Sequence, residues 1–202
     1  MTANAVRVLA LVVFVASGSY AQTPQTQRNP DNPDFKVQVW GDIGVEFIAR
    51  VDSYLELRRQ LEKGLPPLRV TSDPAEIRRA ERALARRIRD ARKMAKRGDI
   101  FTPPISAVFR NALLPQMDAK TWKSVMDDNP GAFSVRINGT YPDKKPLSTV
   151  PANILAVLPR LPDDVQYRFL GPHLVLFDTK ARVILDGIPY AITSPGEPKE
   201  RP

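Results

Sequence analysis

Three short apolar runs near the C-terminal end of the chain constrain the fold more than any other feature of the sequence. They lie within residues 166–188 and are separated by turn-forming residues at 171–173 and 178–181. Short apolar runs with such separators are typical of antiparallel strands that form a meander. The middle run, Leu174–Phe177, is apolar at every position. A strand of this kind has both faces covered, so we expect Leu176 to lie in the core.

The chain before this meander shows mainly helical patterns. Apolar residues recur three, four or seven positions apart, which is the spacing of one helix face. Asp73 and Thr102 each precede a proline, an arrangement typical of a helix start. Glycine or proline follows each predicted end, at Gly64, Gly98 and Pro115. The expected helices span residues 43–63, 73–98, 103–113 and 119–126, with a further helical turn after Pro151.

Two short extended pieces are expected outside the meander. The first comprises residues 37–40, directly before the first helix. The second comprises residues 133–137, where apolar residues alternate with others before the turn signal Asn138-Gly139. The sequence therefore predicts an α+β fold, in which N-terminal amphipathic helices pack on a small C-terminal antiparallel sheet.

The N-terminus has the pattern of a secretory signal peptide. Arg7 precedes an apolar run at residues 8–16, and small residues lead to Ser19-Tyr20-Ala21. The run is shorter than the roughly 20 residues that a spanning helix needs, and no other segment predicts a transmembrane helix. We expect cleavage near Ala21 and release of the chain into the periplasm or the medium.

The remaining chain is expected to form one domain. Residues 22–34 and 194–202 are polar and rich in proline, so we interpret them as a disordered linker and a disordered tail. A single α+β domain is expected over residues 35–193. The chain has no cysteine, so its stability has to come from a packed core rather than from disulfides.

Much of the chain's positive charge lies in residues 73–99, which carry ten Lys or Arg and five Asp or Glu. On a helical wheel, the basic residues Arg82, Arg86, Arg89 and Lys93 fall together on the side opposite a narrow apolar seam. The members of that seam are Ile77, Ala80, Leu84, Ile88, Ala91 and Ala95. The seam is half alanine, which suits packing against a neighbouring helix better than insertion into a membrane.

Two interpretations of the four basic residues remain open at this point. They can form an ordinary solvated helix face, or they can bind an anionic partner. The partners available to an exported protein are an anionic envelope polymer, lipid headgroups or another protein. Nucleic acid is not expected, because no aromatic residues are interleaved with the charges and no recognition motif accompanies them.

The residues needed for familiar catalytic sites are largely missing. The absence of cysteine excludes thiol nucleophiles and thiolate metal sites, and the one histidine, His173, lies in a predicted turn. The carboxylate pairs Asp127-Asp128 and Asp163-Asp164 fall at predicted loop or cap positions. We therefore predict no catalytic residue, no metal ligand and no cofactor. Glycosidases need only two carboxylates brought together by the fold, so a hydrolase remains the alternative to a non-enzymatic binding or scaffold protein.

The segments at residues 98–110, 137–151 and 158–189 together resemble a group of uncharacterised secreted bacterial proteins. That resemblance covers most of the chain and implies export and a single domain, without an activity. The final hairpin is also similar to the C-terminal strands of periplasmic proteins of the nickel/cobalt homeostasis type. The chain departs from a metal-rich pattern because it has a single histidine.

Overall fold

The computed structural model describes residues 33–66, 71–129, 135–142 and 144–196, and it has the predicted α+β architecture. The expected signal peptide, and most of the expected linker and tail, lie outside these residues. The elements in chain order are α1 (Pro33–Lys63), α2 (Pro74–Ala91), α3 (Pro103–Leu113), the 3₁₀ helix η1 (Leu114–Gln116), α4 (Ala119–Asp127), α5 (Ala152–Val157), β1 (Val165–Leu170), β2 (His173–Asp178) and β3 (Val183–Ile188).

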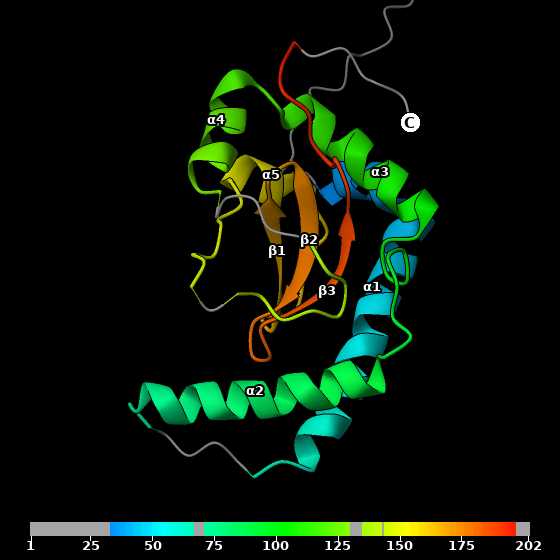
Figure 1. Cartoon of the computed structure of the whole chain (residues 1–202). Coiled ribbons are helices and arrows are strands. Elements are labelled where there is room, and N and C mark those ends of the chain that lie inside the picture. The colour runs from blue at the N-terminus through cyan, green and yellow to red at the C-terminus, as the bar shows by residue number, and fades with distance from the viewer. Residues whose placement is uncertain (1–32, 67–70, 130–134, 143, 197–202) are drawn as a thin grey trace, which may run out of the picture.

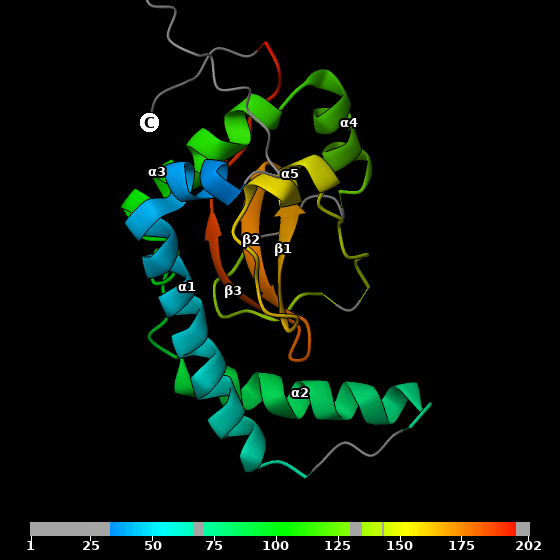
Figure 2. The same cartoon turned by 180° about the vertical axis from the view of Figure 1, so that it is seen from behind.

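The helices surround the small sheet on one side and at both ends. Helix α1 runs along the sheet, α3, α4 and α5 gather near one end of it, and α2 crosses beyond the other end (Figures 1 and 2). The strands form the predicted antiparallel meander in the order β1-β2-β3. In the middle strand, Leu176 is paired with Tyr167 of β1 and Asp186 of β3.

The middle strand is buried on both faces, as its uninterrupted apolar run predicts. Leu174 and Leu176 point into the main core, whereas Val175 and Phe177 point into a second apolar cluster on the opposite face. This division follows from the alternation of side chains along a strand. The prediction that Leu176 lies in the core is confirmed, since none of its surface is exposed.

Aromatic side chains from different elements form the centre of the main core. Phe47 of α1 and Phe109 of α3 have ring centroids 4.9 Å apart, and Phe109 lies 5.9 Å from Tyr167 of β1. The loop residue Phe101 lies 5.0 Å from the same Phe109 ring. Helices α1 and α3 are thereby held against one face of the sheet.

The expected extended piece at residues 37–40 is wrong, because these residues belong to α1. The helix begins at Pro33 and kinks at Gly41, whose φ of 39° and ψ of −136° are non-helical. Such a conformation is accessible to glycine at little cost. Next to the kink, the buried Trp40 donates a hydrogen bond from Nε1 to the carbonyl oxygen of Val157, at 3.0 Å. The kink therefore accompanies the docking of α1 against α5.

Helix α2 begins where the sequence predicts but ends earlier. Asp73 caps it, since its Oδ1 accepts a hydrogen bond of 2.8 Å from the amide of Ala75. The helix ends at Ala91 instead of near Gly98. After that point the chain turns inward, because Arg92 packs over the Tyr54 ring and donates to the carbonyl oxygen of Leu185. Tertiary contacts thus override the local helical pattern.

The second expected extended piece is also wrong where the structure describes it. Residues 135–137 are not a strand, and residues 133 and 134 lie outside the described part of the chain. The turn at Asn138 is present, and Asn138 has a φ of 59°. The residues after this turn lie along the start of β3. The amide of Ile184 donates to the carbonyl oxygen of Gly139 at 2.9 Å, and the amide of Tyr141 donates to that of Arg182, just before the strand, at 2.7 Å. This short segment helps to cover the second face of the sheet.

Candidate functional site

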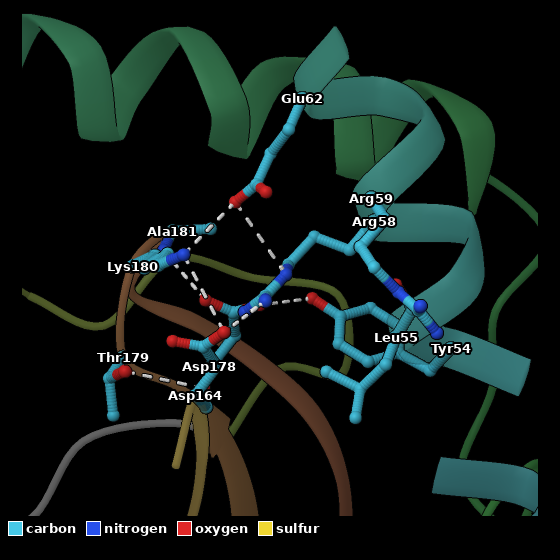
Figure 3. Close-up of polar contacts among 10 residues, drawn as sticks. All are labelled: Tyr54, Leu55, Arg58, Arg59, Glu62, Asp164, Asp178, Thr179, Lys180 and Ala181. Carbon is cyan, nitrogen blue, oxygen red and sulfur yellow. Dashed lines mark hydrogen bonds and ion pairs between the residues drawn. The ribbon is translucent and has the colours of Figure 1, made fainter. Parts of the chain in front are cut away.

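A buried ion-pair cluster joins α1 to the meander (Figure 3). Arg58 of α1 is only 3% exposed, and its guanidinium contacts two carboxylates, Asp164 before β1 and Asp178 at the end of β2. Asp178 is fully buried and also accepts hydrogen bonds from the Tyr54 hydroxyl, at 2.6 Å, and from the amide of Ala181, at 2.7 Å. Each oxygen of this buried carboxylate therefore has a donor.

The outer side of the cluster is closed by a second cation. Lys180 lies with its Nζ 3.5 Å from Asp164 and 3.7 Å from Glu62, and Glu62 lies 3.7 Å from Nε of Arg58. Burial tends to raise the pKa of Asp164, but the contacts with Arg58 and Lys180 outweigh it and lower that pKa below its ordinary value. Burial beside Asp178 raises the pKa of Tyr54, so this hydroxyl stays protonated and keeps donating.

The hydrolase alternative needs two carboxylates that the fold brings close together. In the described part of the chain, this cluster holds such carboxylates, so it is the candidate site for that activity. Its carboxylates are occupied by Arg58, and Asp178 is closed off from solvent. A general acid or base has to reach a substrate, and these groups instead bind each other. The arrangement is that of a clamp between α1 and the sheet.

A second buried carboxylate, Asp186 of β3, organises the loop that follows α2. Its Oδ2 accepts hydrogen bonds of 2.8 Å from the amides of both Ile100 and Phe101, and the amide of Gly98 lies 3.1 Å from Oδ1. A carboxylate that accepts several backbone amides is a stable buried arrangement. Asp186 thus fixes the loop that begins where α2 ends.

The four predicted binding residues lie together on an exposed surface. Arg82, Arg86 and Arg89 are on α2, and Lys93 lies just beyond its end; all four side chains are exposed. Within the described parts of the chain, none of the four side chains makes a hydrogen bond or ion pair with another residue. We call these four residues the basic face.

Other cations in the same stretch have structural contacts instead. Arg87 donates to the carbonyl oxygen of Leu61 at 3.1 Å, and Arg92 is the half-buried residue that packs over Tyr54. The charge of residues 73–99 is therefore divided between contacts inside the protein and the exposed basic face. A helical wheel cannot make this division, because it does not show where the neighbouring elements lie.

The buried side of α2 differs in part from the predicted seam. Leu84 and Ile88 are buried as expected, but Ala91 is exposed and Ala85, which the seam does not include, is buried. The reason is that the 138–142 segment and the turn after β2 lie against the side of α2 that carries Ala85. A pocket of about 160 Å³ lies at this contact, and its lining includes Glu81, Arg82, Ala85, Thr140, Tyr141 and Arg182. No spacing in the sequence predicts this pocket.

The other candidate residues are not gathered at one site. His173 is the first residue of β2 rather than a turn residue, and its Nδ1 accepts a hydrogen bond of 3.0 Å from the amide of Tyr190. Partial burial and the charge of Arg97 lower the pKa of His173. Asp127 and Asp128 lie at the end of α4, as their predicted cap position implies. Asp163 is exposed.

Two further observations concern metals and membranes. Among the described residues, no group of three or more His, Asp or Glu side chains is placed to hold a metal ion. In the same part of the chain, no helix combines the length and apolar character that crossing a bilayer requires.

Comparison with known proteins gives no family assignment. No family model, no curated protein and no solved structure matches the chain. The resemblance to secreted bacterial proteins and to periplasmic nickel/cobalt homeostasis proteins stays a prediction.

Proposed function

We propose that this chain is an exported, non-enzymatic protein that binds an anionic partner of the bacterial envelope through the basic face. The observation that carries this proposal is that Arg82, Arg86, Arg89 and Lys93 are exposed together and make no side-chain hydrogen bond or ion pair with other described residues. The basic face lies on the helix that crosses beyond one end of the sheet (Figure 1). Charges placed in this way are available to a partner and raise the local concentration of anions.

An anionic polymer fits this surface better than a lipid bilayer. A helix that binds at a membrane surface buries bulky apolar side chains among the lipids. In α2 the large aliphatic residues Leu84 and Ile88 are already buried inside the protein. Binding by exposed charges alone needs no insertion, so a phosphate-bearing or carboxylate-bearing polymer of the envelope is the partner that we propose.

Export is the part of the proposal that rests on the N-terminal sequence alone. The apolar run at residues 8–16 and the Ser19-Tyr20-Ala21 site support cleavage after Ala21. Intact-mass measurement on protein recovered from the periplasm or the medium tests this directly. Recovered material that retains residues 1–21 would contradict the proposed localisation.

Replacement of the basic face tests the proposed function. We expect the variant with Arg82, Arg86, Arg89 and Lys93 all changed to Gln to bind immobilised poly(glycerol phosphate) about tenfold more weakly, because several charge contacts are lost together. The thermal midpoint should stay nearly unchanged, since exposed charges contribute little to stability and like charges repel. The difference from the unaltered protein should shrink as salt is added, because screening weakens exposed charges.

A control variant removes the same number of positive charges from elements other than α2. The control changes four exposed bases to Gln, namely Arg110, Lys120, Lys123 and Arg160, which lie on α3, on α4 and before β1. If binding depends on the basic face, this control binds almost as well as the unaltered protein. Equal losses in both variants would mean that net charge alone matters, and no loss in either would leave the basic face as a solvated surface.

A further inference from the structure

The pocket beside α2 is built by backbone contacts between segments far apart in the sequence. The amide of Asn138 donates to the carbonyl oxygen of Ile184 at 2.8 Å, and the amide of Tyr141 donates to that of Arg182 at 2.7 Å. The Asn138 side chain also donates to the carbonyl oxygens of Arg89 and Arg92, which connects the same segment to the end of α2. The relative positions of the pocket walls are therefore fixed before any ligand binds.

The lining of this pocket combines an apolar floor with cations from two separate elements. Ala85 and Tyr141 are buried and form part of the floor. Arg82 comes from α2, and Arg182, which has a φ of 53°, comes from the turn between β2 and β3. The guanidinium carbon of Arg182 lies 5.8 Å from the centre of the Tyr141 ring. This contact orients one of the two cations beside the hollow.

We propose that this pocket receives one phosphoryl group of the anionic partner, held by the guanidinium groups of Arg82 and Arg182; the inference rests on the proposed function. A guanidinium presents its N–H donors in a planar fork that matches phosphate oxygens. Thr140 also lines the pocket, and its hydroxyl is a group that can donate to a phosphate oxygen. A pocket of about 160 Å³ has room for a few water molecules, which suits a single small anionic group rather than a whole sugar or polymer segment.

Arg82 belongs to both the basic face and the pocket, which gives the two sites one continuous surface. The exposed charges of α2 would attract a polyanion without fixing its position, and the pocket would fix one phosphoryl group along it. Glu81 also lines the pocket and would repel that group. The structure therefore points to a modest affinity for a small phosphate, which replacement of Glu81 by Gln should increase.

Binding of glycerol phosphate to the purified exported protein, measured by calorimetry, tests this assignment. We expect Arg182→Gln to weaken binding about tenfold, which is the usual effect of losing a charge-assisted hydrogen bond. Arg182→Lys should restore part of the affinity, because it keeps the charge and loses the fork. Arg160→Gln is the matched control and should leave the affinity unchanged, because Arg160 is exposed and lies outside the pocket lining. A melting curve for each variant separates a loss of binding from a loss of fold.

The binding results test the pocket and the proposed function independently of each other. Unchanged glycerol phosphate affinity in folded Arg182→Gln would overturn the pocket, even if the fourfold basic-face variant loses its binding to poly(glycerol phosphate). Loss of glycerol phosphate binding in Arg182→Gln, with unaltered polymer binding in a variant that changes Arg86, Arg89 and Lys93 to Gln but keeps the pocket residue Arg82, would support the pocket and contradict the proposed function. Acetate that binds as tightly as glycerol phosphate would overturn the preference for a phosphoryl group.

Two further binding experiments, one with lipid vesicles and one with polymer, identify the source of the phosphoryl group. Binding to phosphatidylglycerol vesicles that glycerol phosphate displaces would support the pocket and assign it to a lipid headgroup. Binding to poly(glycerol phosphate) that glycerol phosphate displaces, without vesicle binding, would support the pocket and assign it to a polymer. If glycerol phosphate displaces neither the vesicles nor the polymer, the assignment of the pocket to a phosphoryl group is overturned.

Discussion

Replacement of Arg58 by Met is expected to lower the free energy of unfolding by about 3–5 kcal/mol, the usual cost of removing one partner from a buried ion pair. Asp178 is fully buried, and Arg58 is the cation that contacts it directly. Methionine retains much of the side-chain volume, so the expected loss comes mainly from a carboxylate that is buried without its cation. Urea unfolding followed by circular dichroism measures the change.

The neighbouring residue provides the control for this substitution. Arg59 is also on α1, but its side chain is 60% exposed and pairs with the exposed Glu56. Arg59→Met should therefore cost no more than about 1 kcal/mol. Adding Asp178→Asn to Arg58→Met should recover part of the lost stability, because the unpaired charge is then absent. An Arg58→Met protein as stable as the Arg59→Met protein would contradict the clamp between α1 and the sheet.

The second large effect concerns the middle strand of the meander. Leu176→Asp is expected to cost more than about 4 kcal/mol, because it removes a large aliphatic group and buries an unpaired charge. Leu176 has none of its surface exposed and lies between Tyr167 and Asp186 on the neighbouring strands. A carboxylate at this point would also lie beside the buried carboxylate of Asp186. Thermal unfolding is the direct measurement.

A conservative change at the same position separates the effect of the buried charge from the effect of altered packing. Leu176→Met nearly conserves the side-chain volume and should cost less than about 1.5 kcal/mol. If Leu176→Asp unfolds at the temperature of the unaltered protein, the strand is not enclosed on both faces and the meander is wrongly placed. Similar large losses in both variants would instead mean that the site tolerates no change of shape.

The parts of the fold that could be predicted are those specified by residues close together in the sequence. The meander follows from three apolar runs with turns between them, and the start of α2 follows from Asp73 beside Pro74. The end of α2 could not be predicted in this way, because it depends on Arg92 reaching Leu185 on β3. The cover on the second face of the sheet also depends on distant contacts, since Tyr141 packs against Phe177.

The candidate site shows the same division between local and distant information. The basic face could be predicted, because Arg82, Arg86, Arg89 and Lys93 share one side of a helix. The buried cluster could not, since Arg58 and Asp178 are separated by 120 positions in the chain. The pocket needs Arg182 to meet α2 across the fold, which no spacing in the sequence indicates. The positive φ of Arg182 is likewise a property of the folded turn.

The most direct test of the proposed function is the NMR response of the arginine side chains during titration with poly(glycerol phosphate). The proposal predicts that the Nε–Hε signals of Arg82, Arg86 and Arg89 shift together and saturate, and that the shifts diminish as salt is added. The signal of the buried Arg58 should stay in place, because its guanidinium is already occupied by Asp164 and Asp178. Shifts confined to Arg110 and Arg160, which lie outside α2, or no saturable shift on α2, would contradict it.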